Sequence, residues 1–381
     1  MAEFEVLELT GTPRERGVTH GEAFADEIAQ NVETYLTRFE HEGVDPEEAR
    51  ERADEFVPLV EDVNESYAEE MRGVAEGSGV PLTDVTMLNV RYEVIYTAWK
   101  EQSEEAADGR SPPEDETRRR AGSLTDGCTS FGLLPSATAD GNTYVGQNWD
   151  WLAPVEETLF LTKVRREEKP DHLVFTEAGI VGGKGGVNEH GIGIAVNGLT
   201  SPADGAEPFR KPFHVRCREV MDATRFDEAL LPIVETHRAC SANFVLGAAG
   251  GEVVDLETAP ERFAHLHPDD GVLTHSNHFV TESIESLLER QGPSTLYRAE
   301  RLRRRLVAAA ETGATVEDVA EGLRDHFGRP ASVCKHVDES LPPEEYGQTN
   351  ASFVVDLEGR KMHALRGPPC EGTYEVYELG A

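Results

Sequence analysis

The hydrophobic pattern of this chain changes near residue 100 from a helical to a mainly strand-like period, and this change restricts the possible folds more than any other feature. Up to that point, apolar side chains recur every three or four residues, which predicts amphipathic helices over 14–42, 46–76 and 83–99. Beyond residue 128 the chain divides into short runs rich in β-branched and aromatic residues, with turn signals such as Asp140-Gly141 between them. A helical first part and a strand-rich second part predict an α+β fold.

The segment that joins the two parts, residues 101–122, has no apolar periodicity and contains the adjacent prolines Pro112 and Pro113. We expect it to be a flexible, exposed linker. After it, the residue types predict strands at 129–135, 142–151, 159–165, 172–177, 191–197, 243–246, 252–257, 272–275, 351–357 and 361–365, and helices at 213–223, 226–237, 294–312 and 316–327. The short connections between these strands imply antiparallel pairing.

The chain is strongly acidic, with 36 Lys and Arg against 72 Asp and Glu in 381 residues, which gives a formal net charge of −36 at pH 7. This balance argues against nucleic acid as a partner, because phosphates are held by clustered basic side chains. No run approaches the ~20 apolar residues of a transmembrane helix, and the N-terminus lacks the pattern of a signal peptide, so no membrane partner is expected. An acidic, lysine-poor surface suits concentrated salt, and we expect a cytoplasmic protein of a halophile.

The five cysteines are widely spaced, without the Cys-x-x-Cys pair that would indicate a zinc or redox centre. We expect Cys217, Cys240, Cys334 and Cys370 to be ordinary buried thiols. Cys128 differs, because it follows Gly127 where the linker meets the first predicted strand. A thiol is a strong nucleophile at neutral pH, and a preceding glycine leaves its own carbonyl open to attack.

Attack of the Cys128 thiol on the Gly127 carbonyl would convert this peptide bond into a thioester. Hydrolysis of the thioester would make Cys128 a new N-terminal residue. Its free amine, with a pKa near 7.7–8.0, could then serve as the general base for its own thiol. Spacing alone leaves a second interpretation open, in which Cys128 is a buried strand residue after a loop.

The motif Cys128-Thr129-Ser130-Phe131, followed by Asn148-Trp149-Asp150, resembles the start of the mature chain in the acyl-CoA:6-aminopenicillanate acyltransferase family of N-terminal-nucleophile hydrolases. Other segments are similar to this family in order along nearly the whole chain: 16–17, 20–21, 73–79, 89–93, 186–191, 274–277, 294–301 and 334–336. The resemblance implies a four-layer αββα sandwich with two antiparallel sheets. It also implies cleavage between Gly127 and Cys128, a helical pro-segment 1–127 kept as the small subunit, and a catalytic subunit 128–381.

The resemblance further implies roles for individual positions. Asp150 would orient the new ammonium group of the nucleophile and raise its pKa. Asn277 would stabilise the tetrahedral oxyanion through its side-chain N–H, and Asn197 would line the site. Arg298, or its rival Arg301, would support self-processing. Each position also has an ordinary structural interpretation, as a turn residue or a helix-surface charge.

The same resemblance implies a small-molecule acyl amide or acyl-CoA substrate, no cofactor and no metal. It also implies fragments that stay associated, as one two-chain protomer or as a homodimer. Gln147 stands where the bile-salt hydrolase branch of the family would place an arginine, which favours the acyltransferase-like branch. Hydrolysis and acyl transfer both stay open, because one acyl-enzyme serves both and water access decides between them.

Two further interpretations remain open on the sequence. A metal-dependent hydrolase could use the histidines at 265, 267, 275 and 278 with Asp269 or Asp270, although the usual ligand spacings are absent. A non-catalytic protein of the same fold would retain Cys128 as a structural residue only. The glycine-rich segment 182–186 lacks the Ser or Thr that follows lysine in a phosphate-binding loop, and a tight hairpin is expected there.

Overall fold

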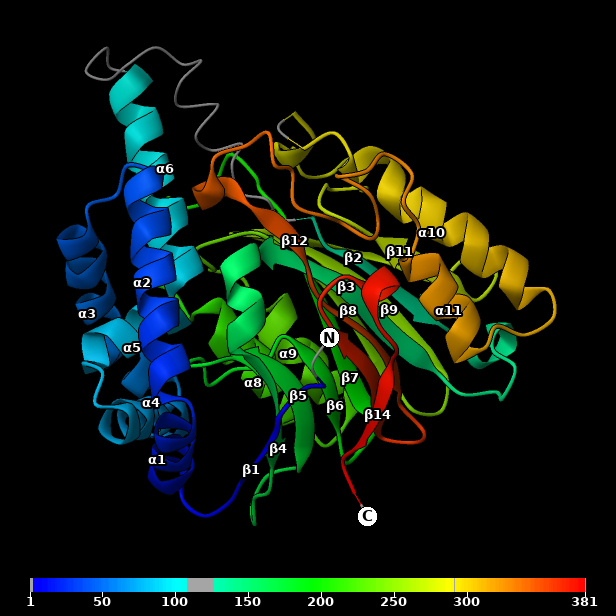
Figure 1. The fold of residues 1–381 in the computed structure, drawn as a ribbon, viewed down its shortest axis with the longest axis horizontal. Helices are drawn as coiled ribbons and strands as arrows, with labels where there is room; N and C mark the ends of the chain where they lie inside the picture. Colours follow the sequence, from blue (N-terminus) through cyan, green and yellow to red (C-terminus); the bar gives the residue numbers. More distant parts are fainter. Residues whose placement is uncertain (1–2, 108–126, 291, 381) are drawn as a thin grey trace.

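The computed structural model describes residues 3–107, 127–290 and 292–380, whose strands form two sheets (Figure 1). The eight-stranded sheet has the order β1 (Val6–Leu9), β4 (Leu159–Val164), β5 (His172–Glu177), β6 (Gly185–Asn188), β7 (Ile192–Gly198), β8 (Ala242–Ala248), β9 (Glu252–Ala259) and β10 (Arg262–Leu266). The six-stranded sheet has the order β11 (Val272–His275), β2 (Thr129–Leu133), β3 (Tyr144–Leu152), β12 (Gly347–Asp356), β13 (Lys361–Arg366) and β14 (Glu375–Glu378). Neighbouring strands are antiparallel except for β1 and β4, which are parallel.

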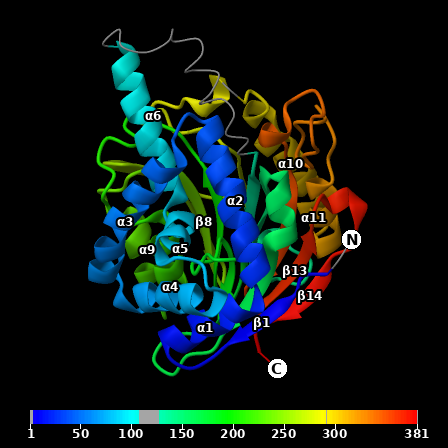
Figure 2. The ribbon, with the colours of Figure 1, turned by 60° about the vertical axis from the view of Figure 1, so that its left-hand side comes forward.

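The two sheets pack face to face, and helices cover both outer faces (Figures 1 and 2). Between the sheets, β2 and β3 contact β7 and β8, and the packing is tight enough that a Cβ at Gly132 would press on Val253. The helices α8 (Phe213–Met221) and α9 (Phe226–Val234) pack on β7, β8 and β9, while α10 (Thr295–Ala310) and α11 (Val316–Leu323) pack on β11, β2 and β12. This is the four-layer αββα sandwich that the family resemblance implied.

Each helix predicted in the first hundred residues is divided into two helices. They are α1 (Pro13–Ala23) and α2 (Ala25–His41), α3 (Pro46–Val63) and α4 (Glu65–Ser78), and α5 (Leu82–Asn89) and α6 (Arg91–Ala107). The break at Asn64 shows the physical reason, since its side chain accepts a hydrogen bond from the Tyr67 backbone N–H and so caps α4. Apolar periodicity continues through such a cap, so it does not reveal the change of direction.

Three other expectations are corrected by the structure. The predicted linker began too early, because 101–107 continue helix α6; its remainder, 108–122, lies outside the described residues. Strands β1, β6, β10 and β14 were not predicted, because they are short and three of them lie at or beside sheet edges.

The segment 182–186 does belong to a hairpin, but 178–184 connect β5 to β6, so the turn is not tight. Its Lys184 is buried in an ion pair with Glu177.

Helices α1 and α4 meet backbone to backbone. A Cβ at Gly17 would overlap the Glu70 carbonyl oxygen, and a Cβ at Gly73 would overlap the Arg14 carbonyl oxygen. Only glycine permits this approach. A buried ion pair between Arg16 and Glu70, with nitrogen and oxygen 2.9 Å apart, stabilises the same contact.

His20 on α1 connects the N-terminal helices to the eight-stranded sheet. Its Nε2 accepts a hydrogen bond of 3.0 Å from the backbone N–H of Gly179, in the β5–β6 connection. Burial lowers the pKa of His20 to about 4, because an imidazolium there would lose its hydration. The folded protein therefore requires the neutral imidazole.

The structure predicts that acid destabilises the fold through His20. The folded-state pKa lies below the unfolded value of 6.5, so this contribution to stability is complete above pH 6.5 and is lost as the pH falls towards 4. Between pH 7.5 and pH 5 the loss should be about 2 kcal/mol. Denaturant unfolding at constant salt should show this loss in the wild type and in the control His190→Gln, whose side chain is exposed, and a smaller loss in His20→Gln. Equal pH dependence in all three proteins would contradict the assignment.

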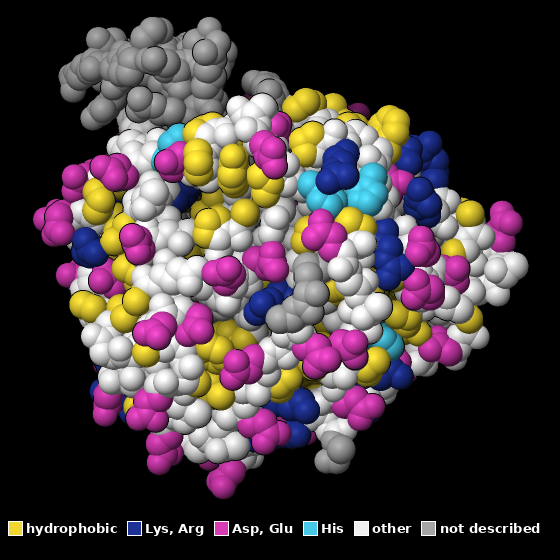
Figure 3. Space-filling view, in the orientation of Figure 1, with side chains coloured by type: hydrophobic (Ala, Val, Ile, Leu, Met, Phe, Trp, Pro, Cys, Tyr) yellow, Lys and Arg dark blue, Asp and Glu magenta, His cyan; other side chains and the backbone are white. Residues whose placement is uncertain are grey.

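Acidic side chains are spread over the visible face of the molecule, with Arg and Lys placed among them (Figure 3). Many of the arginines form ion pairs, as in Arg72 with Glu61 and Glu69 at 2.7 and 2.6 Å. Concentrated salt screens the repulsion between the remaining carboxylates. None of the helices formed by the described residues has the length and apolar composition that crossing a membrane requires.

Candidate active site

The Gly127-Cys128 peptide lies at the start of β2, where this strand passes between β11 and β3 inside the sandwich. The strand register places Thr129 opposite Asn148 of β3, so Cys128 lies beside the end of β3 that carries Asp150. The Cys128 side chain is buried, and its Sγ lies 3.7 Å from the backbone oxygen of Asp150. The candidate nucleophile is therefore held inside the protein and not on the surface.

The carboxylate of Asp150 lies directly against Gly127. A Cβ built on Gly127 would come within 2.7 Å of Asp150 Oδ2 and 3.0 Å of the Lys335 side chain, so a larger residue would disturb both. The hydroxyl of Thr349, on the neighbouring strand β12, donates a 2.6 Å hydrogen bond to Asp150 Oδ1. Sheet pairing and this hydrogen bond hold the buried carboxylate beside the bond that would be cleaved.

Arg298 reaches the junction from the first turn of α10 and is buried. Its Nη1 donates to the carbonyl oxygens of Gly127 and Cys128, the latter at 2.6 Å, and to Thr129 Oγ1 at 2.8 Å. Its Nη2 donates to Asn277 Oδ1 at 2.7 Å. A permanent positive charge thus faces the carbonyl group on which negative charge would develop during attack by the thiol.

The rival arginine lies elsewhere. Arg301 binds the carboxylate of Asp325 at 2.7 and 2.6 Å, and its guanidinium stacks over the ring of Phe327. Arg301 lies three positions after Arg298 on α10, but the two side chains bind different partners. Of the two arginines, the structure places Arg298 at the junction.

Two asparagines complete the surroundings of the peptide. Asn197, on β7 of the opposite sheet, donates from Nδ2 to the carbonyl oxygens of Cys128, His275 and Ser276 at 3.4, 3.3 and 3.1 Å. Asn277 follows β11 and is held by Thr295 of α10, whose Oγ1 accepts from the Asn277 backbone N–H at 2.7 Å. The Asn277 amide nitrogen, which was expected to face the oxyanion, donates instead to the Gly198 carbonyl at 3.0 Å.

The structure therefore brings together all five predicted site residues, which come from the residue before β2, from β3 and β7, from the segment after β11, and from α10. Three further residues at the junction were not predicted as site residues: Thr129, Lys335 and Thr349. Two of the three lie within segments that resemble the family, at 128–131 and 334–336. Thr349 had no sequence signal, because only the strand pairing of β12 with β3 places it beside Asp150.

The histidines proposed as metal ligands do not converge on one point. His265 on β10 and His267 just after it are exposed, whereas His275 is buried and lies 2.8 Å from Glu257 Oε1. Burial alone would lower the pKa of His275, but the carboxylates of Asp255 and Glu257 outweigh it and raise the pKa above its ordinary value. His278 Nδ1 pairs with the Thr295 hydroxyl at 2.9 Å. This metal-site hypothesis was wrong, because none of these histidines belongs to a group of three or more neighbouring ligand atoms among the described residues.

Comparisons with known proteins agree with the motifs at the junction. A family described as acyl-coenzyme A:6-aminopenicillanic acid acyl-transferase matches residues 137–369. The acyl-coenzyme A:6-aminopenicillanic-acid-acyltransferase 40 kDa form of Emericella nidulans is 27% identical over 365 residues, which cover 94% of this chain and 91% of that protein.

Solved structures with lower similarity include two hydrolases. The Caenorhabditis elegans ortholog of N-acylethanolamine-hydrolyzing acid amidase has a TM-score of 0.48 at 15% identity, covering 60% of this chain and 93% of that chain. A variant of the conjugated bile acid hydrolase from Clostridium perfringens has a TM-score of 0.46 at 13% identity, covering 66% of this chain and 92% of that chain.

Proposed function

This chain belongs to the acyl-coenzyme A:6-aminopenicillanic acid acyl-transferase family and is an enzyme of acyl transfer or acyl-amide hydrolysis; from this premise we propose that it activates itself by cleavage before Cys128. We further propose that the thiol of Cys128 then carries the acyl group during turnover. One observation above all supports this: the buried Gly127-Cys128 peptide has a guanidinium on its carbonyl oxygen and a carboxylate against its glycine.

Self-cleavage would begin with attack of the Cys128 sulfur on the Gly127 carbonyl carbon. Arg298 donates to the oxygen on which negative charge develops, and it would therefore stabilise the tetrahedral intermediate. The carbon–nitrogen bond then breaks, and the thiol proton ends on the nitrogen that becomes the α-amine of Cys128. Water hydrolyses the resulting thioester, which releases the Gly127 carboxylate and restores the thiol.

In turnover, the new α-amine of Cys128 would take the proton from its own thiol. The thiolate attacks the acyl carbonyl of the substrate, the bond to the leaving amine or CoA breaks, and the amine of Cys128 returns the proton to that leaving group. Water or an acceptor amine then takes the acyl group from the sulfur and restores the thiol. Asp150, which already lies against Gly127, would orient the ammonium form and raise its pKa. Asn277 would donate to the oxyanion, which requires its amide group to leave the Gly198 carbonyl once Gly127 has moved away. Asn197 holds the Cys128 carbonyl in both steps.

The helical segment would remain bound after cleavage as a small subunit. Buried contacts join this segment to the eight-stranded sheet. Asn31 Nδ2 donates a hydrogen bond to the Ala178 carbonyl at 2.8 Å, and Arg91 forms an ion pair with Glu177 at 2.7 Å. Breaking such an interface would expose a buried ion pair and much of the shared hydrophobic core. We propose that the fragments 1–127 and 128–381 form one protomer, located in the cytoplasm of a salt-adapted cell.

An intact-mass spectrum tests this proposal without knowledge of the substrate. Protein purified in concentrated salt is measured once under denaturing conditions and once by size exclusion in the same salt. We expect two chains that meet between Gly127 and Cys128 in the first measurement, and a single eluting species containing both in the second. A single uncleaved chain after long incubation would instead favour a non-catalytic relative of the fold.

The substrate class proposed here is a small-molecule acyl amide or acyl-CoA thioester, because a thiolate nucleophile attacks both kinds of carbonyl. An acyl-CoA donor is supported by the similarity to the Emericella nidulans relative, which is an acyl-coenzyme A acyltransferase. A panel of N-acyl amino acids and acyl-CoA donors, assayed with and without an acceptor amine, separates hydrolysis from transfer. Acyl-enzyme on Cys128, detected by mass after brief exposure to a donor, would identify the active class.

A further inference from the structure

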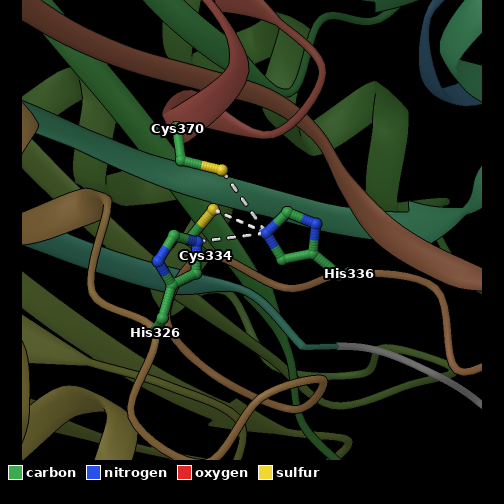
Figure 4. A group of neighbouring side chains, drawn as sticks. All are labelled: His326, Cys334, His336 and Cys370. Atoms are coloured by element: carbon green, nitrogen blue, oxygen red, sulfur yellow. Dashed lines mark hydrogen bonds between the residues drawn. The ribbon is translucent and has the colours of Figure 1, made fainter.

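A group of four side chains outside the candidate active site has the composition of a metal centre. His326, Cys334 and His336 lie in the loop that follows α11, and Cys370 lies in the short 3-10 helix η5 (Pro369–Glu371) (Figure 4). One ligand atom from each residue lies within 4.8 Å of the ligand atoms of the other three. We infer that these two cysteines and two histidines bind a structural Zn²⁺ ion that fastens the loop to η5.

The distances within the group agree with tetrahedral coordination. The Nε2 atom of His336 lies 3.1 Å from His326 Nε2, 3.5 Å from Cys334 Sγ and 3.4 Å from Cys370 Sγ. A tetrahedral zinc ion with Zn–N bonds of about 2.05 Å and Zn–S bonds of about 2.3 Å would place two nitrogens about 3.3 Å apart, and a nitrogen and a sulfur about 3.6 Å apart. The observed separations lie close to these values.

The chemistry of the group also favours a cation. A single ring nitrogen, His336 Nε2, faces three polar atoms, although it has either one proton or one lone pair to offer. A cation between the four atoms would give every lone pair a partner. The other ring nitrogen, Nδ1, lies 3.5 Å from Glu371 Oε1, which is how a carboxylate orients a metal-binding histidine.

Zinc is the metal that this ligand set selects, because two thiolates with two imidazoles suit a tetrahedral borderline-soft ion. Cys334 and His336 are buried, while His326 and Cys370 are exposed, so an ion has a route from solvent. Four protein ligands leave no open position for a substrate, which indicates a structural site and not a catalytic one. The expectation of an ordinary buried thiol was wrong for Cys370, which is exposed. The spacing of the cysteines along the sequence did not predict that Cys370 and Cys334 come together.

The proposed ion would act on the candidate active site through Lys335, which lies between two of its ligands. The Lys335 backbone N–H donates to Thr349 Oγ1 at 3.0 Å, and the Thr349 N–H donates to the Lys335 carbonyl at 3.1 Å. The same Thr349 hydroxyl donates to Asp150 Oδ1. Zinc would therefore fix the segment that positions Asp150 and that packs its lysine side chain against Gly127.

The test uses the full-length Cys128→Ala protein under reducing conditions, so that the reactive thiol does not compete for metal. The protein is stripped with a chelator and titrated with Zn²⁺ against a chromophoric chelator, and in parallel with Co²⁺. We expect one ion per chain, and a Co²⁺ spectrum with tetrahedral d–d bands and thiolate charge-transfer absorption. Cys370→Ser and His326→Asn should each weaken binding at least about 100-fold, whereas His326→Cys, which retains a ligand, should keep it.

The control variant is His237→Asn, which removes a ligand from an exposed Glu207–His237–Glu261 group that could bind ions weakly. It should leave the tight site unchanged. Any of the following results would overturn the inference: no stoichiometric binding to the stripped protein, Co²⁺ bound without thiolate absorption, or affinity lost equally in His237→Asn. A Cys334–Cys370 disulfide that persists in the folded protein under reductant would also overturn it. Because binding is measured on uncleaved protein, failure of self-processing would not affect this result.

Discussion

Replacing Cys128 with Ala is expected to leave a single uncleaved chain and to abolish turnover of every acyl substrate. The substitution removes the sulfur that attacks the Gly127 carbonyl, and without cleavage no α-amine forms at residue 128. Removal of a nucleophile that acts as a unit with its base lowers the rate by about 10⁴-fold or more. Denaturing mass spectrometry measures the cleavage, and the release of free amine or CoA measures the turnover.

The matched control for this variant is Cys217→Ala, which removes a buried thiol on α8. Burial raises the pKa of Cys217 far above its ordinary value, so this thiol is an inert packing residue. The control should be cleaved and active. Thermal unfolding of both variants in concentrated salt shows whether each is folded. Cleavage or turnover in folded Cys128→Ala protein would exclude Cys128 as the nucleophile.

Replacing Arg298 with Met should cause the precursor to accumulate, with self-cleavage slowed about 10²–10³-fold, the effect of losing one oxyanion donor. The cause is the loss of the guanidinium that donates to the Gly127 carbonyl oxygen. Arg298 also donates to Asn277 and Thr129, so turnover by any cleaved protein should fall as well. The rate follows from the fraction of two-chain protein at successive times after refolding into salt.

Arg301→Met is the matched control, because it removes another arginine side chain one helical turn further along α10. The partner of that side chain is Asp325 and not the junction. It should cleave at the wild-type rate. Arg298→Lys keeps the positive charge and should recover part of the rate, which a purely structural role for Arg298 would not predict. Slower cleavage in Arg301→Met with normal cleavage in Arg298→Met would reverse the assignment of the two arginines.

Part of the candidate site could be predicted from sequence because its chemistry is local. Gly127 and Cys128 are adjacent, and an attack across one peptide bond needs no distant residue. Asp150 lies in a motif that follows at a short interval, and an antiparallel pair of strands brings it back beside Cys128. The roles of Asp150, Asn197, Asn277 and Arg298 came from the resemblance to a family, since spacing along the chain alone does not relate them to Cys128.

The amino-acid sequence by itself determined the fold class, because the period of the apolar residues decides between helix and strand over a few residues. The tertiary structure decided everything that depends on direction and distance: the breaks at Phe24, Asn64 and Val90, and the choice of Arg298 over Arg301. It also joined Cys370 to Cys334 across 36 residues and turned an expected absence of metal into a candidate zinc site. Contacts of this kind form when helices and strands that are distant in the sequence pack together, and local sequence patterns do not predict that packing.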